Sequence, residues 1–266
     1  MITSLLLYLA VGAVAGVLAG LLGVGGGLVI VPMLNFAFAL EHIPDQFIQH
    51  LALGTSLGSI MFTSVSSFRA HHKRGAVLWR EVVFRITPGI ITGTLLGSWV
   101  AAGLSTSFLK GFFVCFLYWV AAQMLLNLKP KASRELPGSG GMFGMGNVIG
   151  VVSSLVGIGG GTLSVPFMAW CNVPMHTAIG TSAAIGFPIA VAGTVGYIVN
   201  GLAVAGLPEN TFGFIHVPAL IGIVGASVFT APLGARLAHS LPVARLKRIF
   251  AVLLLVMGTR MLWGLL

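Results

Sequence analysis

The sequence predicts an all-α polytopic membrane protein made of two inverted five-segment repeats, each beginning with a broken or re-entrant helical hairpin. Its 266 residues are 57% hydrophobic and 7% charged, whereas a soluble domain carries about 25% charged residues. Apolar runs near the ~20 residues that a helix needs to cross hydrocarbon recur along the whole chain. A glycine-rich motif in one of these runs returns in the second half, which indicates a duplication.

Two pairs of motifs define this duplication. "GLLGVGGGLVIVPML" (Gly20–Leu34) and "SLVGIGGGTLSVPFM" (Ser154–Met168) place their glycines 134 positions apart. "HLALGTS" (His50–Ser56) and "HTAIGTS" (His176–Ser182) are 126 positions apart. The offsets differ only through loop lengths, and a polar stretch rich in Pro, Gly and Ser separates the copies. We therefore expect a first membrane repeat at 1–128, a cytoplasmic linker at 129–138 and a second repeat at 139–266.

Each repeat is expected to contain five helical segments. The first run has no positively charged residue before it, so we interpret it as a membrane segment and not as a cleaved signal peptide. The second segment of each repeat has about a dozen residues, which is too short to span the bilayer comfortably at ~1.5 Å per residue. The expected segments of the first repeat are 2–22, 27–40, 46–69, 80–103 and 106–128. Those of the second are 139–156, 161–172, 175–200, 210–238 and 243–265.

The positions of basic residues predict that the two repeats are inserted in opposite directions. The loop after the third segment is basic in the first repeat and has no Lys or Arg in the second, and the next loop reverses this pattern. Positive loops stay in the cytoplasm. The first two segments of each repeat must then enter and return as a hairpin, and both termini face the outer side of a prokaryotic inner membrane. The basic loop residues are Arg69, Lys73, Arg74, Arg80, Lys129, Lys131, Arg134, Arg236, Arg245, Lys247 and Arg248.

The repeated glycines predict an anion site. Irregular backbone at membrane depth is tolerated where it is buried in protein or lines a wet cavity, and a helix start presents unpaired N–H groups that favour an anion. Two inverted repeats would direct two such starts at one midplane site. Hydroxyl, amide and imidazole groups nearby would supply further contacts. The expected substrate-binding residues are Gly25, Gly26, Gly27, Asn35, His50, Thr55, Ser56, Gly159, Gly160, Gly161, Thr162, His176, Thr181 and Ser182.

Several of these residues have a second interpretation. The glycines and the "GTS" hydroxyls would also serve close helix packing, and His50 and His176 are either structural or act as ligands or pH sensors. Arg260 either snorkels to the outer interface or places a charge near the pathway. No Asp or Glu falls deep in a predicted span, which argues against a cation site.

Other classes of function find no support in the sequence. The net charge of +9 comes from basic residues in the short loops that set the orientation of the chain in the membrane. We therefore expect no nucleic-acid partner. Cys115 and Cys171 form no metal set and no disulfide framework, and no phosphate-binding loop is present. We expect no enzyme activity, no cofactor and no metal. The expected partners are a small anion and the lipid bilayer, with a homodimer left open.

At the two glycine motifs and the two "GTS" motifs the chain resembles the TauE/SafE family, the sulfite-exporter-like membrane permeases. The resemblance covers essentially the whole chain. It implies transport, in the direction of export, of sulfite or organosulfonates such as sulfoacetate, with Gly25–Gly27 and Gly159–Gly161 as the glycine motif. The alternatives are an anion channel or uniporter for another small anion, and a membrane enzyme that handles a sulfur compound.

Overall fold

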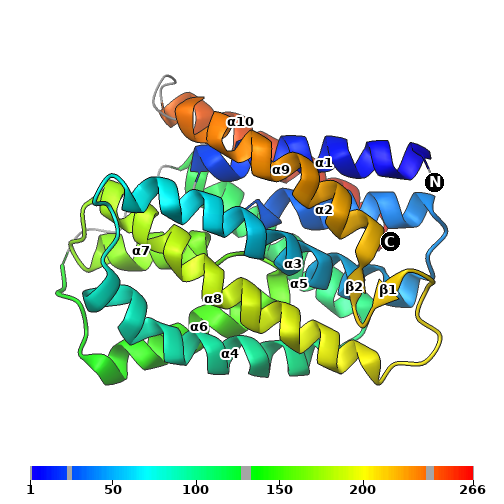
Figure 1. The fold of residues 1–266 in the computed structure, drawn as a ribbon, viewed down its shortest axis with the longest axis horizontal. Helices are drawn as coiled ribbons and strands as arrows, with labels where there is room; N and C mark the ends of the chain where they lie inside the picture. Colours follow the sequence, from blue (N-terminus) through cyan, green and yellow to red (C-terminus); the bar gives the residue numbers. More distant parts are fainter. Residues whose placement is uncertain (1, 23–25, 127–132, 238–242, 266) are drawn as a thin grey trace.

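The computed structural model describes residues 2–22, 26–126, 133–237 and 243–265, and these form long helices that run roughly parallel and antiparallel to one another (Figure 1). The first half contains α1 (Ile2–Leu22), α2 (Gly27–Leu40), α3 (Asp45–His72), the π-helical turn η1 (Trp79–Val83), α4 (Phe84–Ala102) and α5 (Thr106–Leu125). The second half contains α6 (Ser139–Val156), α7 (Gly161–Trp170), α8 (Met175–Leu202), β1 (Thr211–Phe212), β2 (Ile215–His216), α9 (Val217–Leu237) and α10 (Val243–Trp263).

The helices agree closely with those expected from the sequence, with two corrections. The helix expected from residue 210 begins at Val217, because 211–216 forms a β-hairpin with Thr211 opposite His216. Gly213, with a φ of +56°, makes this tight turn, a conformation that glycine adopts at little cost. The helix expected from residue 80 begins instead with the π-helical turn η1.

Five of the described helices are long and apolar enough to cross a membrane, namely α3, α5, α6, α8 and α9. Within the described residues α2 and the apolar part of α1 (Ser4–Gly20) are shorter, and α7 has 10 residues. In each half the second helix returns toward the end of the molecule at which the first helix begins (Figure 1).

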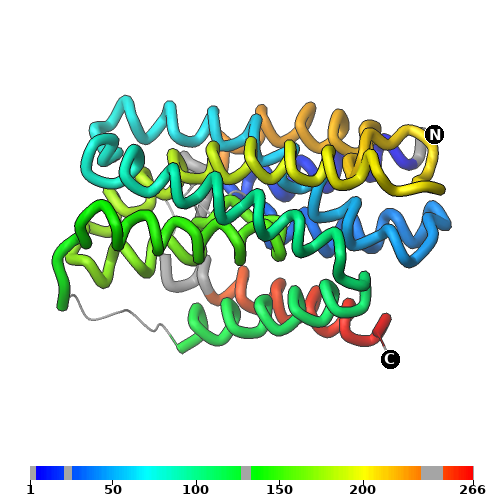
Figure 2. Tube along the Cα trace, turned by 90° about the horizontal axis from the view of Figure 1, so that it is seen from below, coloured from blue at the N-terminus to red at the C-terminus, as the bar shows by residue number. Residues whose placement is uncertain are grey.

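The two halves pack against each other through equivalent helices. α1 packs against α9 and α4 against α6, so the first helix of each half lies beside the fourth helix of the other. The two third helices, α3 and α8, pair with each other, as do the two fifth helices, α5 and α10. The loops that follow α3 and α8 lie at opposite ends of the molecule, whereas the chain termini lie at the same end (Figures 1 and 2).

Glycines bring the backbones of the first and fourth helices close together. A Cβ at Gly89 of α4 would overlap the carbonyl oxygen of Phe143 in α6, and a Cβ at Gly93 would overlap that of Asn147. A Cβ at Gly12 of α1 would likewise overlap the carbonyl oxygen of Ile223 in α9. Small residues allow this approach in membrane helices, where packing and not the hydrophobic effect drives association.

Candidate functional site

The two glycine motifs form the starts of α2 and α7. Gly26 precedes α2 with a φ of +76°, and Gly160 precedes α7 with a φ of +74°. Side chains rarely adopt this left-handed conformation, so glycine is required at both positions. Gly25 lies outside the described residues.

The start of α2 is in contact with the glycine loop that leads from α6 into α7. Gly27 packs directly on the backbone of Gly157, and a Cβ at Gly27 would overlap the carbonyl oxygen of Gly157. The Ser56 hydroxyl of α3 donates to this same carbonyl at 2.8 Å. A helix of the first half thereby holds the glycine loop of the second half in place.

The second glycine loop carries an excess of hydrogen-bond donors. The carbonyl of Gly160 accepts from the N–H groups of Leu163 (3.1 Å) and Ser164 (2.8 Å). The four N–H groups of 159–162 find no acceptor among the described residues. A run of free N–H groups at a helix start is a ready anion site.

Two buried hydroxyls next to this loop also have no partner among the described residues, namely those of Thr162 and Ser153. Ser153 lies beside the loop, because a Cβ built on Gly160 would be 3.4 Å from its Oγ. Buried polar groups are nearly always hydrogen-bonded. These two hydroxyls and the free N–H groups can therefore serve a ligand that accepts hydrogen bonds.

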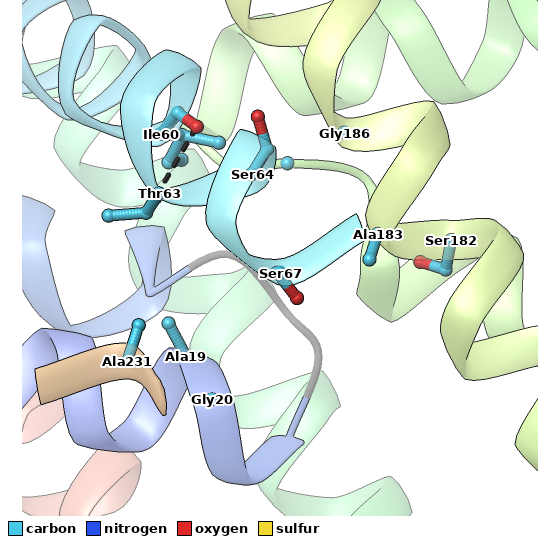
Figure 3. A pocket seen from close by; sticks show the side chains of 11 residues that line it. Ala19, Gly20, Ile60, Thr63, Ser64, Ser67, Ser182, Ala183, Gly186 and Ala231 are labelled. Atoms are coloured by element: carbon cyan, nitrogen blue, oxygen red, sulfur yellow. Dashed lines mark hydrogen bonds between the residues drawn. The ribbon is translucent and has the colours of Figure 1, made fainter. Parts of the chain in front are cut away.

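A small cavity of about 20 Å³ opens beside the same loop, between α1, α3, α8 and α9 (Figure 3). Its polar lining comprises Thr63, Ser64, Ser67 and Ser182, and Gly159 and Gly186 contribute backbone. Space of this size holds about one water molecule. In this conformation the cavity is therefore too small for an oxyanion with three or four oxygens.

The "GTS" motifs of α3 and α8 are placed equivalently, and each holds the loop that leads into the fourth helix of the other half. The Thr55 hydroxyl accepts from the N–H of His216 at 2.9 Å, and the Thr181 hydroxyl accepts from the N–H of Leu78 at 3.0 Å. The preceding glycines, Gly54 and Gly180, leave no room for a Cβ beside these loops. Thr55 and Thr181 thus join the two halves by hydrogen bonds.

Asn35, His50 and His176 do not line the cavity. The Asn35 amide donates to Gln49 at 2.8 Å on α3. His50 is buried, with Nε2 at 3.0 Å from the Ala101 carbonyl. His176 is exposed at the start of α8. Among the described residues, the structure therefore brings Ser56, Thr162, Ser182 and the glycines at 26, 27 and 159–161 into one region, and it places Asn35, His50 and His176 elsewhere.

Sequence reasoning missed Ser153, Thr63, Ser64 and Ser67. Comparison of the two repeats selects duplicated residues, and Ser153 aligns with Ala19, which has no hydroxyl. Thr63, Ser64 and Ser67 of α3 align, at the offset of 126, with the apolar stretch 189–193 of α8. The polar run "TSVSS" in the middle of a membrane helix was the available signal.

The described residues contain no group of three or more His, Cys, Asp or Glu side chains that could hold a metal ion. Cys171, which follows α7, is buried, and this burial raises the pKa of its thiol. A nucleophilic cysteine has a lowered pKa instead.

Comparison with known proteins gives consistent matches. The family model described as "Sulfite exporter TauE/SafE" matches residues 8–261. A probable membrane transporter protein of Haemophilus influenzae is 37% identical, with 98% of this chain and 99% of that protein covered. A probable membrane transporter protein of Methanocaldococcus jannaschii is 27% identical, with 96% of this chain and 94% of that protein covered. One of Bacillus subtilis is 25% identical, with 98% of each chain covered. No solved structure matches the chain.

Proposed function

The chain belongs to the sulfite exporter TauE/SafE family, and we propose that it exports a small sulfur oxyanion, such as sulfite, or an organosulfonate such as sulfoacetate. It is a multi-pass membrane transporter, as are its relatives by name. The observation that carries the choice of an anion is the second glycine loop, where four N–H groups and two buried hydroxyls lack acceptors among the described residues. An oxyanion offers several acceptor oxygens at once, and this is what such a donor set requires.

The proposed site combines residues of both halves. Gly159, Gly160, Gly161 and Thr162 supply donors from the second half, with the added hydroxyl of Ser153. Ser182 supplies a hydroxyl in the adjoining cavity. The first half contributes Gly25–Gly27 and Ser56, whose hydroxyl bonds to Gly157.

The proposed architecture is a pair of inverted repeats, 1–128 and 139–266, joined by a cytoplasmic linker at 129–138. The cross-half helix pairs support this division, as does the equivalence of the Thr55 and Thr181 contacts. The loops after α3 and α8, which occupy the same position in each half, lie at opposite ends of the molecule. With basic loops in the cytoplasm of a prokaryotic cell, both termini face the outer side of the inner membrane.

The geometry implies that transport requires movement of the two halves. The cavity of about 20 Å³ is too small for an oxyanion, so the helices that line it would have to move apart for one to bind. In transporters of inverted repeats, one repeat rocks against the other around the site. A negative cell interior would favour export by about 2.3 kcal/mol per charge per 100 mV.

Flux measurements in proteoliposomes test this function. The purified chain is reconstituted and supplied with sulfite, sulfate, thiosulfate, taurine, sulfoacetate or chloride. We expect saturable flux of a sulfur oxyanion or sulfonate that is accelerated by the same solute on the opposite side. Flux of chloride alone, or flux that does not saturate, would contradict the proposal and favour a channel.

A further inference from the structure

A second, larger pocket lies between α2, α3, α5 and α10, at the end of the molecule where α10 ends. Its volume is about 550 Å³, which is far more than a small oxyanion occupies. Most of its lining is apolar, with Met33, Phe36, Met257, Met261 and Trp263 among the lining residues. The size and the walls fit an amphiphile.

The same pocket is lined by three charged side chains. Lys110 and Arg260 are the two cations, and Asp45 is the one carboxylate. Arg260 is exposed, and its Cζ lies 6.0 Å from the centre of the Phe36 ring. Lys110 is an electrostatic neighbour of Asp45. The lining therefore has two positive charges and one negative charge, so one positive charge has no counter-charge within the lining.

Asn35 adds an unpartnered acceptor to this lining. It is 7% exposed, and its Nδ2 donates to the Val31 carbonyl at 3.0 Å and to Gln49 at 2.8 Å. Its Oδ1 is buried and has no donor among the described residues. The pocket lining thus contains two cations that can hold an oxyanion and, besides the carboxylate of Asp45, the Asn35 oxygen that lacks a hydrogen-bond donor.

We propose that this pocket binds phosphatidylethanolamine, with the phosphate on Lys110 and Arg260 and the ammonium group toward Asp45 and Asn35. The negative phosphate pairs with the two cations, and the ammonium group donates to the two acceptors. The acyl chains lie against the apolar walls of the pocket. Trp263 stands at the end of α10, where aromatic side chains sit at the headgroup level. Lysine and arginine side chains both pair with phosphate oxygens through charge-assisted hydrogen bonds.

Lipid titration of the purified full-length chain, followed by native mass spectrometry, tests the proposal. We expect phosphatidylethanolamine to saturate one tight site, and Arg260→Gln and Lys110→Gln to bind it about fivefold more weakly. Arg85→Gln, which removes an exposed arginine from the start of α4, is the matched control and should bind normally. Asp45→Asn should weaken phosphatidylethanolamine more than phosphatidylglycerol, which has no ammonium group.

Three outcomes would overturn the proposal. The first is equal binding by Arg260→Gln and Arg85→Gln. The second is equal affinity for phosphatidylethanolamine and phosphatidylcholine, because the latter headgroup has no N–H donor. The third is sulfite binding that is lost in Arg260→Gln while lipid binding is kept, which would make the pocket a small-anion site. Arg260 is exposed, so its replacement should leave folding intact.

Discussion

At the scale of single residues, the structure separates the residues that join the halves from those that are free for a ligand. Thr55 and Thr181 each accept a backbone N–H from the other half, whereas Thr162 has a buried hydroxyl without a partner among the described residues. The sequence marks Thr55, Thr162 and Thr181 alike as small polar residues in apolar helices. Only the packing shows which hydroxyl is already used.

Thr55→Val and Thr181→Val should each destabilise the protein by about 1–3 kcal/mol, because each leaves a backbone N–H without its acceptor. Valine keeps the shape of the side chain. Thr194→Val is the control, since its hydroxyl donates to the Ala190 carbonyl of the same helix at 2.7 Å. Thermal unfolding in detergent measures the effect. A shift at Thr194→Val as large as at the other two positions would contradict this account.

Gly27→Ala should destabilise the protein by about 1–3 kcal/mol, because the added methyl would overlap the Gly157 carbonyl and push the start of α2 away from the loop that follows α6. Gly144→Ala on α6 has open space around the added Cβ, and a helical alanine is better than glycine by about 0.5–1 kcal/mol. The two variants should therefore shift the unfolding temperature in opposite directions. Equal shifts would show that Gly27 is not held against the other half.

At the scale of helices, hydrophobic runs and motif offsets were enough to predict nearly every element. The runs predicted α1, α5 and α6 within a few residues of their ends, because an apolar helix in a membrane is set by length and composition. The β-hairpin at 211–216 was not predicted, since it depends on contact with α3 and on two residues, Asn210 and Gly213, with positive φ. The π-helical turn η1 has no signature in the sequence that we can identify.

Gly150→Val on α6 should cost about 1–3 kcal/mol more than Gly144→Val on the same helix. A Cβ at Gly150 would lie 2.6 Å from the Ile90 carbonyl oxygen of α4, whereas Gly144 faces open space. If the repeats are equivalent, Gly16→Val on α1, which is the aligned position 134 residues earlier, should have a similar cost. If Gly16→Val lowered the free energy of unfolding only as much as Gly144→Val does, the two repeats would not be equivalent at this position.

At the scale of the whole molecule, the distribution of charge predicts two inverted repeats, and the structure shows which helices of the two halves are in contact. Opposite insertion of the repeats stays a prediction, with which the position of the loops after α3 and α8 at opposite ends of the molecule is compatible (Figures 1 and 2). The size of the space at the site could not be predicted, because it depends on how closely two distant segments pack. The cavity of about 20 Å³ is lined by residues of both halves, among them Ala19, Ser64 and Ser182.

Single cysteines in a chain without Cys115 and Cys171 test the orientation. Lys73 and Glu209 are exposed and follow the third helix of each half. We expect a membrane-impermeant maleimide to label Glu209→Cys in intact cells and Lys73→Cys only after the membrane is opened. Labelling of both from the same side would exclude inverted repeats.

A sulfite site at the second glycine loop is tested by the affinity of the purified protein for sulfite when the hydroxyl of Thr162 is removed. Thr162→Val keeps the helix start but deletes a donor next to the free N–H groups, and the loss of a hydrogen bond to a charged ligand weakens binding about tenfold or more. We expect this loss in Thr162→Val and unchanged binding in Thr194→Val. Equal affinity for sulfite in the wild type and in both variants would contradict a sulfite site at the second glycine loop.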